Sequence, residues 1–288
     1  MLSTCCVSCP AKLNFGLKVL PKRLDGYHDI ESIFSTISLC DELEVKVTGT
    51  KDSCAVTCDS MELPQKNTIT STYAAFKELT GIELPGVSVN IRKHIPAGGG
   101  LGGGSSDAAG FLKALDLLCR TNLSTDAMND IASKVGSDVF FFLRCDSNSR
   151  GCAVVTGRGE NVRPISRRDD LHFLLIFPGL HSSTKEAYDL VDRHYEAGGI
   201  LEYPQLDSLE EIYNQKVQNW NFVNTFTDVI SSRYSIIKQA VFDLKKAGAL
   251  FADMSGSGST VFGVFDSKAA LLNAQKKLGS DWSMCSTF

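Results

Sequence analysis

The chain has 288 residues, of which 43% are hydrophobic and 22% are charged, and its formal net charge is −4. This length allows one large core or two modest ones, and the composition is ordinary for a globular protein. The charge balance disfavours nucleic acid or a membrane surface as a partner. No segment reaches the length of a membrane span, and the first ten residues lack the pattern of a signal or transit peptide. We therefore expect a cytoplasmic protein, either a monomer or a homodimer.

The ten cysteines could indicate disulfides, a metal site or simple packing. Disulfides are not expected without a secretory signal. Cys5, Cys6 and Cys9 form a cluster, and Cys54 and Cys58 form a pair, but no matching Cys or His pair follows at zinc-site spacing. We expect reduced cysteines that pack as small apolar residues.

The first part of the chain is predicted to form strands and then a helix. Asp25–Gly26 is a strong turn signal between the first two strands. A helical spacing of apolar residues precedes the stop signal Gly81, and an alternating strand follows it. The predicted strands are 4–20, 27–39, 41–47 and 86–96, and the predicted helix is 67–81.

The rest of the chain alternates between helices and strands without an internal repeat. Two helices follow the glycine-rich segment, the second of them at 125–136. The polar stretch 166–170 is the best boundary, which gives predicted domains of 1–166 and 167–288. Beyond the boundary we expect a strand at 171–179, helices at 184–199 and 235–248, and two strands around a Gly/Ser turn within 249–265.

Six of the seven positions from Gly98 to Gly104 are glycine, and they lie directly between a strand and a helix. Glycine lets a ligand approach the backbone, and a helix N-terminus presents unpaired N–H groups with a partial positive charge. Ser105 and Ser106 can cap the helix or offer hydroxyls to a phosphate or a phosphate-bound metal. A flexible linker would not need this junction. The pattern therefore indicates a phosphate-binding loop.

Three common nucleotide motifs fit this loop poorly. Gly98, Gly100 and Gly103 satisfy G-x-G-x-x-G, but several strands precede them and no convincing acid follows at dinucleotide-site spacing. The Walker pattern requires a lysine directly before Ser105, where the chain has glycine. The protein-kinase motifs H-R-D and D-F-G are absent.

The segment IPAGGGLGGGSSDAA resembles the phosphate loop of the GHMP kinases, which are named for galactose, homoserine, mevalonate and phosphomevalonate. PAKLNFGLKVLPKRLDGYHDIES resembles the N-terminal motif of that family, and DMSGSGSTVFGVF resembles its C-terminal glycine motif. The resemblance implies an α+β fold of two domains. The N-terminal domain would be like domain 2 of ribosomal protein S5, the C-terminal domain would be ferredoxin-like, and the active site would lie in the cleft between them.

The combination of PAKLN with DGYH is similar to one branch of the family. Its members use ATP to phosphorylate the 2-hydroxyl of cytidine diphosphate-linked methylerythritol in the non-mevalonate route to isoprenoids. The alternatives are a GHMP kinase of the mevalonate or homoserine type, a non-catalytic nucleotide sensor on the same fold, and an NAD-dependent oxidoreductase. Tyr27 and His28 after the turn disfavour the first, and Lys12 together with Asp138 disfavours the second.

Lys12 and Asp138 are the candidates for the chemistry of phosphoryl transfer. Lys12 lies two residues before Asn14 on an extended segment, so these two side chains share a face. Asp138 precedes four apolar residues and is either a turn residue or a buried functional acid. The resemblance makes Lys12 the catalytic lysine and Asp138 the general base toward the substrate hydroxyl. Phe140 stands where the family usually has proline.

The resemblance also implies the binding residues, with ATP as co-substrate and Mg²⁺ as cofactor, although it leaves the metal ligands unspecified. Asn14, Tyr27, His28, Thr184 and Tyr188 would bind the acceptor, with the two tyrosines stacking on cytosine. Ser257 and Gly258 would shape the floor of the site, and Ser259 stands where proline or alanine is commoner. The ATP residues would be Asn67 and Lys93 near adenine, and the loop Pro96, Ala97, Gly98, Gly99, Gly100, Leu101, Gly102, Gly103, Gly104, Ser105 and Ser106.

Overall fold

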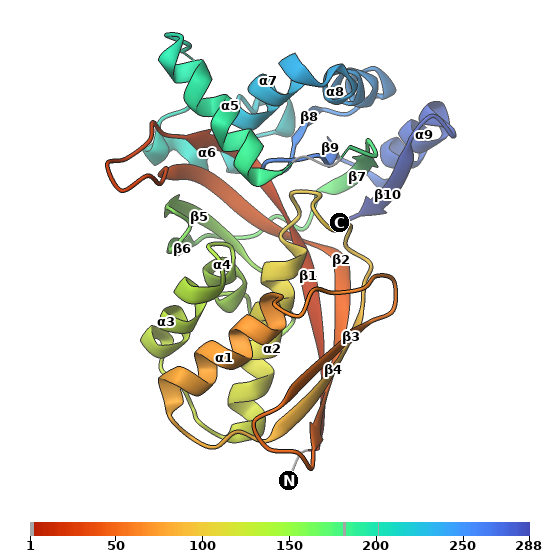
Figure 1. The fold of residues 1–288 in the computed structure, drawn as a ribbon. Coiled ribbons are helices and arrows are strands. Elements are labelled where there is room, and N and C mark those ends of the chain that lie inside the picture. Colours follow the sequence, from red (N-terminus) through yellow and green to blue (C-terminus); the bar gives the residue numbers. More distant parts are fainter. Residues whose placement is uncertain (1–2, 181–182, 201) are drawn as a thin grey trace. The chain divides into compact units, whose positions relative to one another are not determined.

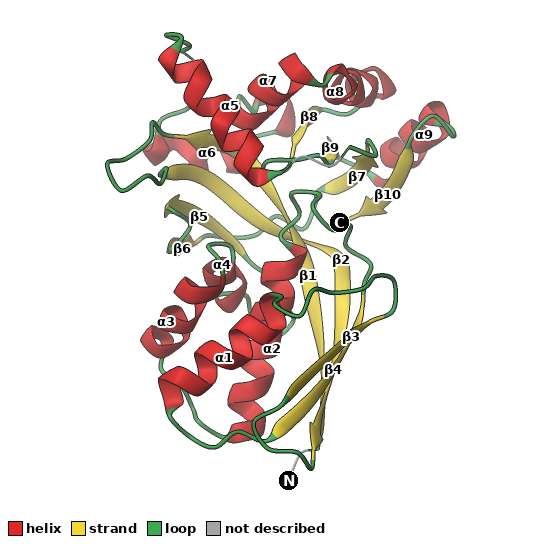
Figure 2. Cartoon of the chain, viewed as in Figure 1, coloured by secondary structure: helices red, strands yellow, loops and turns green. Residues whose placement is uncertain are grey.

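A computed structural model describes residues 3–180, 183–200 and 202–288 of the chain (Figures 1 and 2). The chain divides into two compact units, each assembled from segments that are distant in sequence. The domain boundary predicted at residue 166 remains a prediction. The first unit takes residues up to 11, 39–97 and 102–151, and the second takes 12–38, 98–101 and the chain from 152 onward.

The first unit contains a sheet built around β4 (Gly86–Arg92). The second half of β2 (Ile30–Thr48) runs antiparallel to β4, with Leu43 opposite Ile91. On its other side β4 pairs in parallel with β3 (Cys54–Cys58), and α1 (Thr68–Thr80) connects these two strands. The first part of β1 (Thr4–Val19) also belongs to this unit.

The remaining helices of this unit are α2 (Gly103–Cys119), α3 (Thr125–Val135) and α4 (Val139–Leu143). Helix α1 begins at a capping box between Asn67 and Thr70 and ends at Gly81, whose φ of 62° suits glycine. Helices and sheet share one apolar core, because each presents a row of apolar side chains to the other. Its buried members include Leu43, Val45, Ile69, Phe76, Val87, Val89, Ile91, Phe111, Leu112 and Leu115.

The second unit contains an antiparallel sheet in the order β10-β7-β9-β8. Its strands are β7 (His172–Phe177), β8 (Phe251–Met254), β9 (Val261–Phe265) and β10 (Ser283–Thr287). Helix α8 (Ser235–Ala247) contacts β8 and β9, and α9 (Lys268–Leu278) contacts β7. A β-α-β-β-α-β succession in this strand order is ferredoxin-like, which confirms the fold expected for the C-terminal part.

The other elements of the second unit lie before and within this arrangement. Strand β5 (Cys152–Gly157) pairs antiparallel with the first half of β2 and with β6 (Asn161–Pro164). Helices α5 (Thr184–Glu196), α6 (Leu209–Asn214) and α7 (Thr225–Arg233) follow β7, with single 3-10 turns at Leu206–Ser208 and Val217–Asn219. No helix in the described part of the chain combines the length and the apolar character needed to cross a bilayer.

The two strands predicted at 27–39 and 41–47 are a single strand, so that prediction is wrong at its break. Asp41 is fully buried within this strand. Its Oδ1 accepts hydrogen bonds from the backbone N–H groups of His94 (2.6 Å) and Ile95 (2.8 Å). A carboxylate that satisfies neighbouring backbone donors can continue a strand instead of ending it.

Aromatic rings form the centre of the second unit around Phe15 of β1, which is fully buried. Their centroids lie 5.1 to 6.5 Å from that of Phe15, the range of favourable aromatic pairs. The partners are Phe173, Tyr213, Trp220, Phe222 and Phe262. Phe15 therefore anchors the strand that also carries Lys12 and Asn14.

We expect Phe15→Ala to lower the free energy of unfolding by about 3–5 kcal/mol, because it leaves a cavity among rings that cannot close over it. Urea titration followed by tryptophan fluorescence and circular dichroism measures the loss. Phe242→Ala is the matched control, since this ring on α8 is 58% exposed and should cost little. Equal losses from the two substitutions would show that the cluster does not stabilise the unit as described.

Candidate functional site

Lys12 lies on β1 with its side chain almost wholly buried. Its Nζ donates to Asn14 Oδ1 (2.5 Å) and to the carbonyl oxygen of Gly100 (2.7 Å). Asn14 Nδ2 in turn donates to Ser32 Oγ at 3.3 Å. The shared face predicted for Lys12 and Asn14 is therefore confirmed, and the ammonium has a fixed position against the glycine loop.

The glycine motif after β8 contacts this same part of the loop. Ser255 Oγ donates to the Gly100 carbonyl at 3.0 Å, and the N–H of Thr260 donates to the Gly99 carbonyl at 3.2 Å. A Cβ at Gly100 would lie 2.0 Å from the Ser255 carbonyl oxygen, and the φ of Gly100 is 74°. Close approach and backbone conformation both require glycine at this position.

Gly98, Gly100 and Gly102 all have positive φ, at 69°, 74° and 72°. Such alternation turns successive N–H groups toward one side, which is the geometry of an anion-binding nest. Gly102 is the N-cap of α2, and as a glycine it provides no side-chain capping bond to this end of the helix. The first-turn N–H groups of α2 are therefore available to an anionic ligand.

Lys93 and Asp107 stabilise the first turns of α2. Lys93 Nζ bonds to Asp41 Oδ2 (2.6 Å) and to Asp107 Oδ2 (2.7 Å). Burial raises the pKa of Asp107 to about 7, although the Lys93 ammonium opposes that rise. Burial alone would lower the pKa of Lys93, but the two carboxylates raise it above its usual value. Lys93 is thus a charged residue held by carboxylates, and its predicted place near adenine remains a prediction.

Asn67 also has local partners. Its Oδ1 accepts from the Thr70 N–H at 3.0 Å, and its Nδ2 donates to the Pro64 carbonyl at 2.9 Å. These bonds cap the beginning of α1, so Asn67, which the resemblance places near adenine, has a structural role here. A contact with adenine, which remains a prediction, would involve polar groups that already have partners.

Asp138 is half-buried and occupies the N-cap position of α4, without a capping hydrogen bond from its side chain. Phe140 is the second residue of that helix and is buried. Proline there would push Val139 out of helical conformation. Phenylalanine therefore lets α4 begin directly after Asp138. The pairing of Asp138 with Lys12 remains a prediction.

After β1 the chain turns, and this turn leaves the Tyr27 ring exposed to solvent and the His28 ring buried. Tyr27 is 50% exposed, and the Arg158 guanidinium lies 3.7 Å from its ring centroid. His28 is buried, with Nδ1 donating to the Leu20 carbonyl at 2.8 Å and Nε2 lying 3.3 Å from Asp192 Oδ1. The exposed ring is thus the one whose face a base could reach after displacement of the guanidinium.

His28 stacks on Tyr188 of α5, with centroids 5.0 Å apart and planes at 29°. The structure therefore brings together two of the residues predicted to recognise the acceptor. Thr184 starts α5, and its Oγ1 lies 3.3 Å from Ser257 Oγ in the third glycine motif. Ser259 Oγ donates to the carbonyl oxygen of Leu180.

Sequence reasoning did not identify Arg158 or Asp192. Asp192 follows Tyr188 by four residues on α5, so helical periodicity places both on the face that meets His28. Arg158 follows Gly157 at the end of β5, a strand that was not predicted, and no local pattern linked it to Tyr27.

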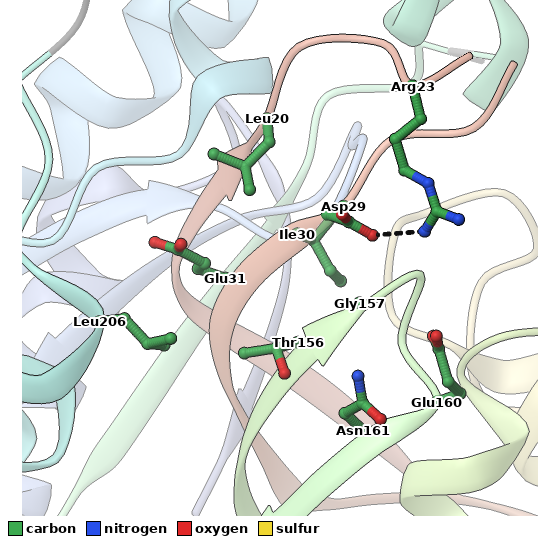
Figure 3. Close-up of a pocket in the computed structure, with 10 residues that line it drawn as sticks. All are labelled: Leu20, Arg23, Asp29, Ile30, Glu31, Thr156, Gly157, Glu160, Asn161 and Leu206. Carbon is green, nitrogen blue, oxygen red and sulfur yellow. Dashed lines mark hydrogen bonds and ion pairs between the residues drawn. The ribbon is translucent and has the colours of Figure 1, made fainter. Parts of the chain in front are cut away.

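A pocket of about 370 Å³ lies beside the strand that follows His28 (Figure 3). Its lining includes the carboxylates of Asp29, Glu31 and Glu160, of which Asp29 pairs with Arg23 at 2.9 Å and Glu31 pairs with Lys18 at 3.1 Å. Much of the negative charge beside the pocket is therefore balanced by cations of the protein itself. Its lining residues are Leu20, Arg23, Asp29, Ile30, Glu31, Thr156, Gly157, Glu160, Asn161 and Leu206.

The described residues contain no cluster of three His, Cys, Asp or Glu side chains placed to hold a metal ion. None of the ten cysteines, all in the described part, forms a disulfide. Burial raises the pKa of Cys54 and of Cys152 to about 11, which keeps these thiols protonated.

Comparison with known proteins identifies the family. Residues 67–145 match the family model of the GHMP kinases N terminal domain, and residues 204–283 match that of the GHMP kinases C terminal domain. The chain is 40% identical to 4-diphosphocytidyl-2-C-methyl-D-erythritol kinase of Treponema pallidum (strain Nichols), over 96% of this chain and 94% of the relative. It is 37% identical to the protein of that name from Parabacteroides distasonis, over 89% and 90% of the two chains.

The fold agrees with this assignment. A crystal structure of 4-(cytidine 5'-diphospho)-2C-methyl-D-erythritol kinase matches with a TM-score of 0.79 and 26% identity, covering 98% of each chain. A homoserine kinase from Cytophaga hutchinsonii matches with a TM-score of 0.69 at 19% identity, which shows a shared fold alone. The chain therefore belongs to the GHMP kinases, a family of enzymes that use ATP to phosphorylate small molecules.

Proposed function

We propose that this protein is a 4-diphosphocytidyl-2-C-methyl-D-erythritol kinase, which transfers the γ-phosphoryl group of ATP to the 2-hydroxyl of that substrate in the non-mevalonate route to isoprenoids. The observation that carries the proposal is the match over nearly the whole chain to relatives of that name. The contact of Lys12 with the glycine loop supports it, because phosphoryl transfer depends on positioning and on charge neutralisation.

In the proposed reaction the 2-hydroxyl oxygen attacks the γ-phosphorus as the bond to the β–γ bridging oxygen breaks. Asp138 accepts the hydroxyl proton, and ADP leaves with the bridging oxygen. Lys12 stabilises the charge that develops on the transferred group, because its ammonium is already oriented by Asn14 and Gly100. The N–H groups of the glycine loop and of the first turn of α2 hold the ATP phosphates.

Mg²⁺ fits the residues at the start of α2. Ser106 Oγ is buried and has no hydrogen-bond partner among the described residues. A hydroxyl oxygen is a suitable ligand for this ion, which prefers oxygen donors. When bound, Mg²⁺ would neutralise phosphate charge. Ser106 is therefore the residue that we propose to hold it.

Acceptor recognition is assigned to the surface around the Asp25–Gly26 turn. Tyr27 offers an exposed ring to the cytosine, and the next residue, His28, is buried and stacks on the half-buried ring of Tyr188. Asn14 and Thr184 are proposed to contact the rest of the acceptor. A cytoplasmic location and the choice between monomer and homodimer remain predictions.

An acceptor panel tests the proposal directly. The purified protein with ATP and Mg²⁺ should release ADP with 4-diphosphocytidyl-2-C-methyl-D-erythritol and not with mevalonate or homoserine, which have no base for Tyr27 to stack on. Coupled ADP detection and mass spectrometry of the product measure this. Equal activity on mevalonate or homoserine would contradict the assignment, and nucleotide binding without turnover of any acceptor would indicate a sensor.

Asp138→Asn should reduce turnover by about 10²–10⁴-fold while ATP still binds, because only the proton acceptor is lost. Lys12→Ala should cause a comparable loss. The double variant should lose less than the product of the two, since the residues act as a unit. Steady-state kinetics and equilibrium binding of ATP give these values.

Asp126→Asn is the control, as this exposed acid in the first turn of α3 has no proposed role. Near-normal turnover in folded Asp138→Asn protein would remove Asp138 from the reaction.

Tyr27→Ala should weaken acceptor binding by about 1–3 kcal/mol, the value of one base–aromatic stack, and leave ATP affinity unchanged. Tyr27→Phe retains the ring and should bind the acceptor normally. Titration calorimetry with each ligand separates the two effects. A parallel loss of affinity for ATP and acceptor would show that Tyr27 acts through the fold and not through the base.

A further inference from the structure

Asn224 is a buried polar residue whose side-chain amide makes three hydrogen bonds. It is 1% exposed and caps α7, where its Oδ1 accepts from the Phe226 N–H at 2.9 Å. Its Nδ2 donates to the carbonyls of Met254 (2.8 Å) and Gly256 (2.9 Å). A helix cap needs only the acceptor, so the two donated bonds require another explanation.

Those two carbonyls lie on either side of Ser255. Ser255 Oγ donates to the Gly100 carbonyl, and that carbonyl also accepts the ammonium of Lys12. The turn approaches Lys12 closely, since a Cβ at Gly256 would lie 3.2 Å from Lys12 Nζ. A shift of this turn would therefore move the partners that fix the lysine.

The residues next to Asn224 bind the strand that carries Lys12. The N–H of Leu17 donates to the Val223 carbonyl at 2.9 Å. Thr225 Oγ1 accepts from the Val19 N–H at 2.9 Å and donates to the Leu17 carbonyl at 3.1 Å. Residues 223–225 thus connect β1 and the third glycine motif through buried hydrogen bonds, which are costly to break.

We propose that Asn224 is a positioning residue for phosphoryl transfer, which holds the turn at Ser255 against Gly100 and thereby sets the position of the Lys12 ammonium. This inference rests on the proposed role of Lys12. The residue needs no contact with either substrate to act in this way. A polar side chain that supports a catalytic group affects the rate because small displacements in such sites are costly.

Two substitutions separate this role from helix capping. Asn224→Asp keeps an oxygen that can accept from Phe226 and replaces the donor with an oxygen that faces two carbonyls. Asn224→Ser keeps a capping hydroxyl, lacks both donated bonds and introduces no charge. Ser267→Ala is the matched control, because it removes the cap of α9, where Ser267 accepts from the Ala270 N–H, in the same unit.

Both Asn224 variants should lower kcat by about 10–10²-fold, the cost of a misplacement of about 1 Å, whereas Ser267→Ala should leave it within twofold. In a Lys12→Ala background, Asn224→Ser should cause no further loss, since a residue that acts through Lys12 has nothing left to position. A full additional loss in that background, or unchanged kcat in both variants, would overturn the proposal.

Hydrogen exchange gives a readout that does not depend on activity. The amides of Lys12 and Thr260, which donate to the loop carbonyls of Leu101 and Gly99, should exchange at least about tenfold faster in Asn224→Ser than in Ser267→Ala. Unchanged exchange at both amides would overturn the proposal even if activity fell. Wild-type protein that turns over no acceptor would instead count against the proposed function, while the exchange result still decides the positioning.

Discussion

The carbonyl oxygen of Gly100 holds together the candidate site residues of the second unit. It accepts hydrogen bonds from both Lys12 Nζ and Ser255 Oγ, so the first and third family motifs meet on the backbone of the second. Carbonyl oxygens have two lone pairs, and both are used here. A side chain at Gly100 would collide with Ser255, which explains why the loop must be bare at this residue. Glycine at position 100 is therefore a requirement of packing within the protein, independent of any ligand.

In the first unit, buried ion pairs hold the N-terminal end of α2. This helix begins at Gly102, which has no side chain that could cap its N–H groups. Lys93, in the segment after β4, forms ion pairs with Asp41 of β2 and with Asp107 of α2. These ion pairs hold the beginning of α2 in place. Breaking such a buried pair is strongly destabilising because a lone charge would remain. The helix end is thus held in place while its N–H groups remain available for a ligand.

Much of the fold could be predicted because periodicity and turn signals are local. The helix at 67–81 has its cap, its spacing and its stop in one stretch, and the structure gives α1 at Thr68–Thr80. The structure has a single strand, Ile30–Thr48, where two strands are predicted, and Asp41 stands at the predicted break. Its carboxylate is satisfied by backbone donors more than 50 residues away, and no local pattern reports that. Short elements such as α4 and β6 have too few residues to establish a period.

Site residues could be predicted where a local sequence motif identifies them. They could not be predicted where their role depends on contacts between residues that are distant in the sequence. Lys12 and Asn14 share a face because strands alternate, and their contact follows from that rule. Asn224 lies between the predicted helices 184–199 and 235–248, where the sequence predicts no element, although its amide joins the cap of α7 to the turn at Ser255. The contact of Arg158 with the Tyr27 ring could not be predicted from the sequence either, since the two residues meet only because β5 pairs with β2.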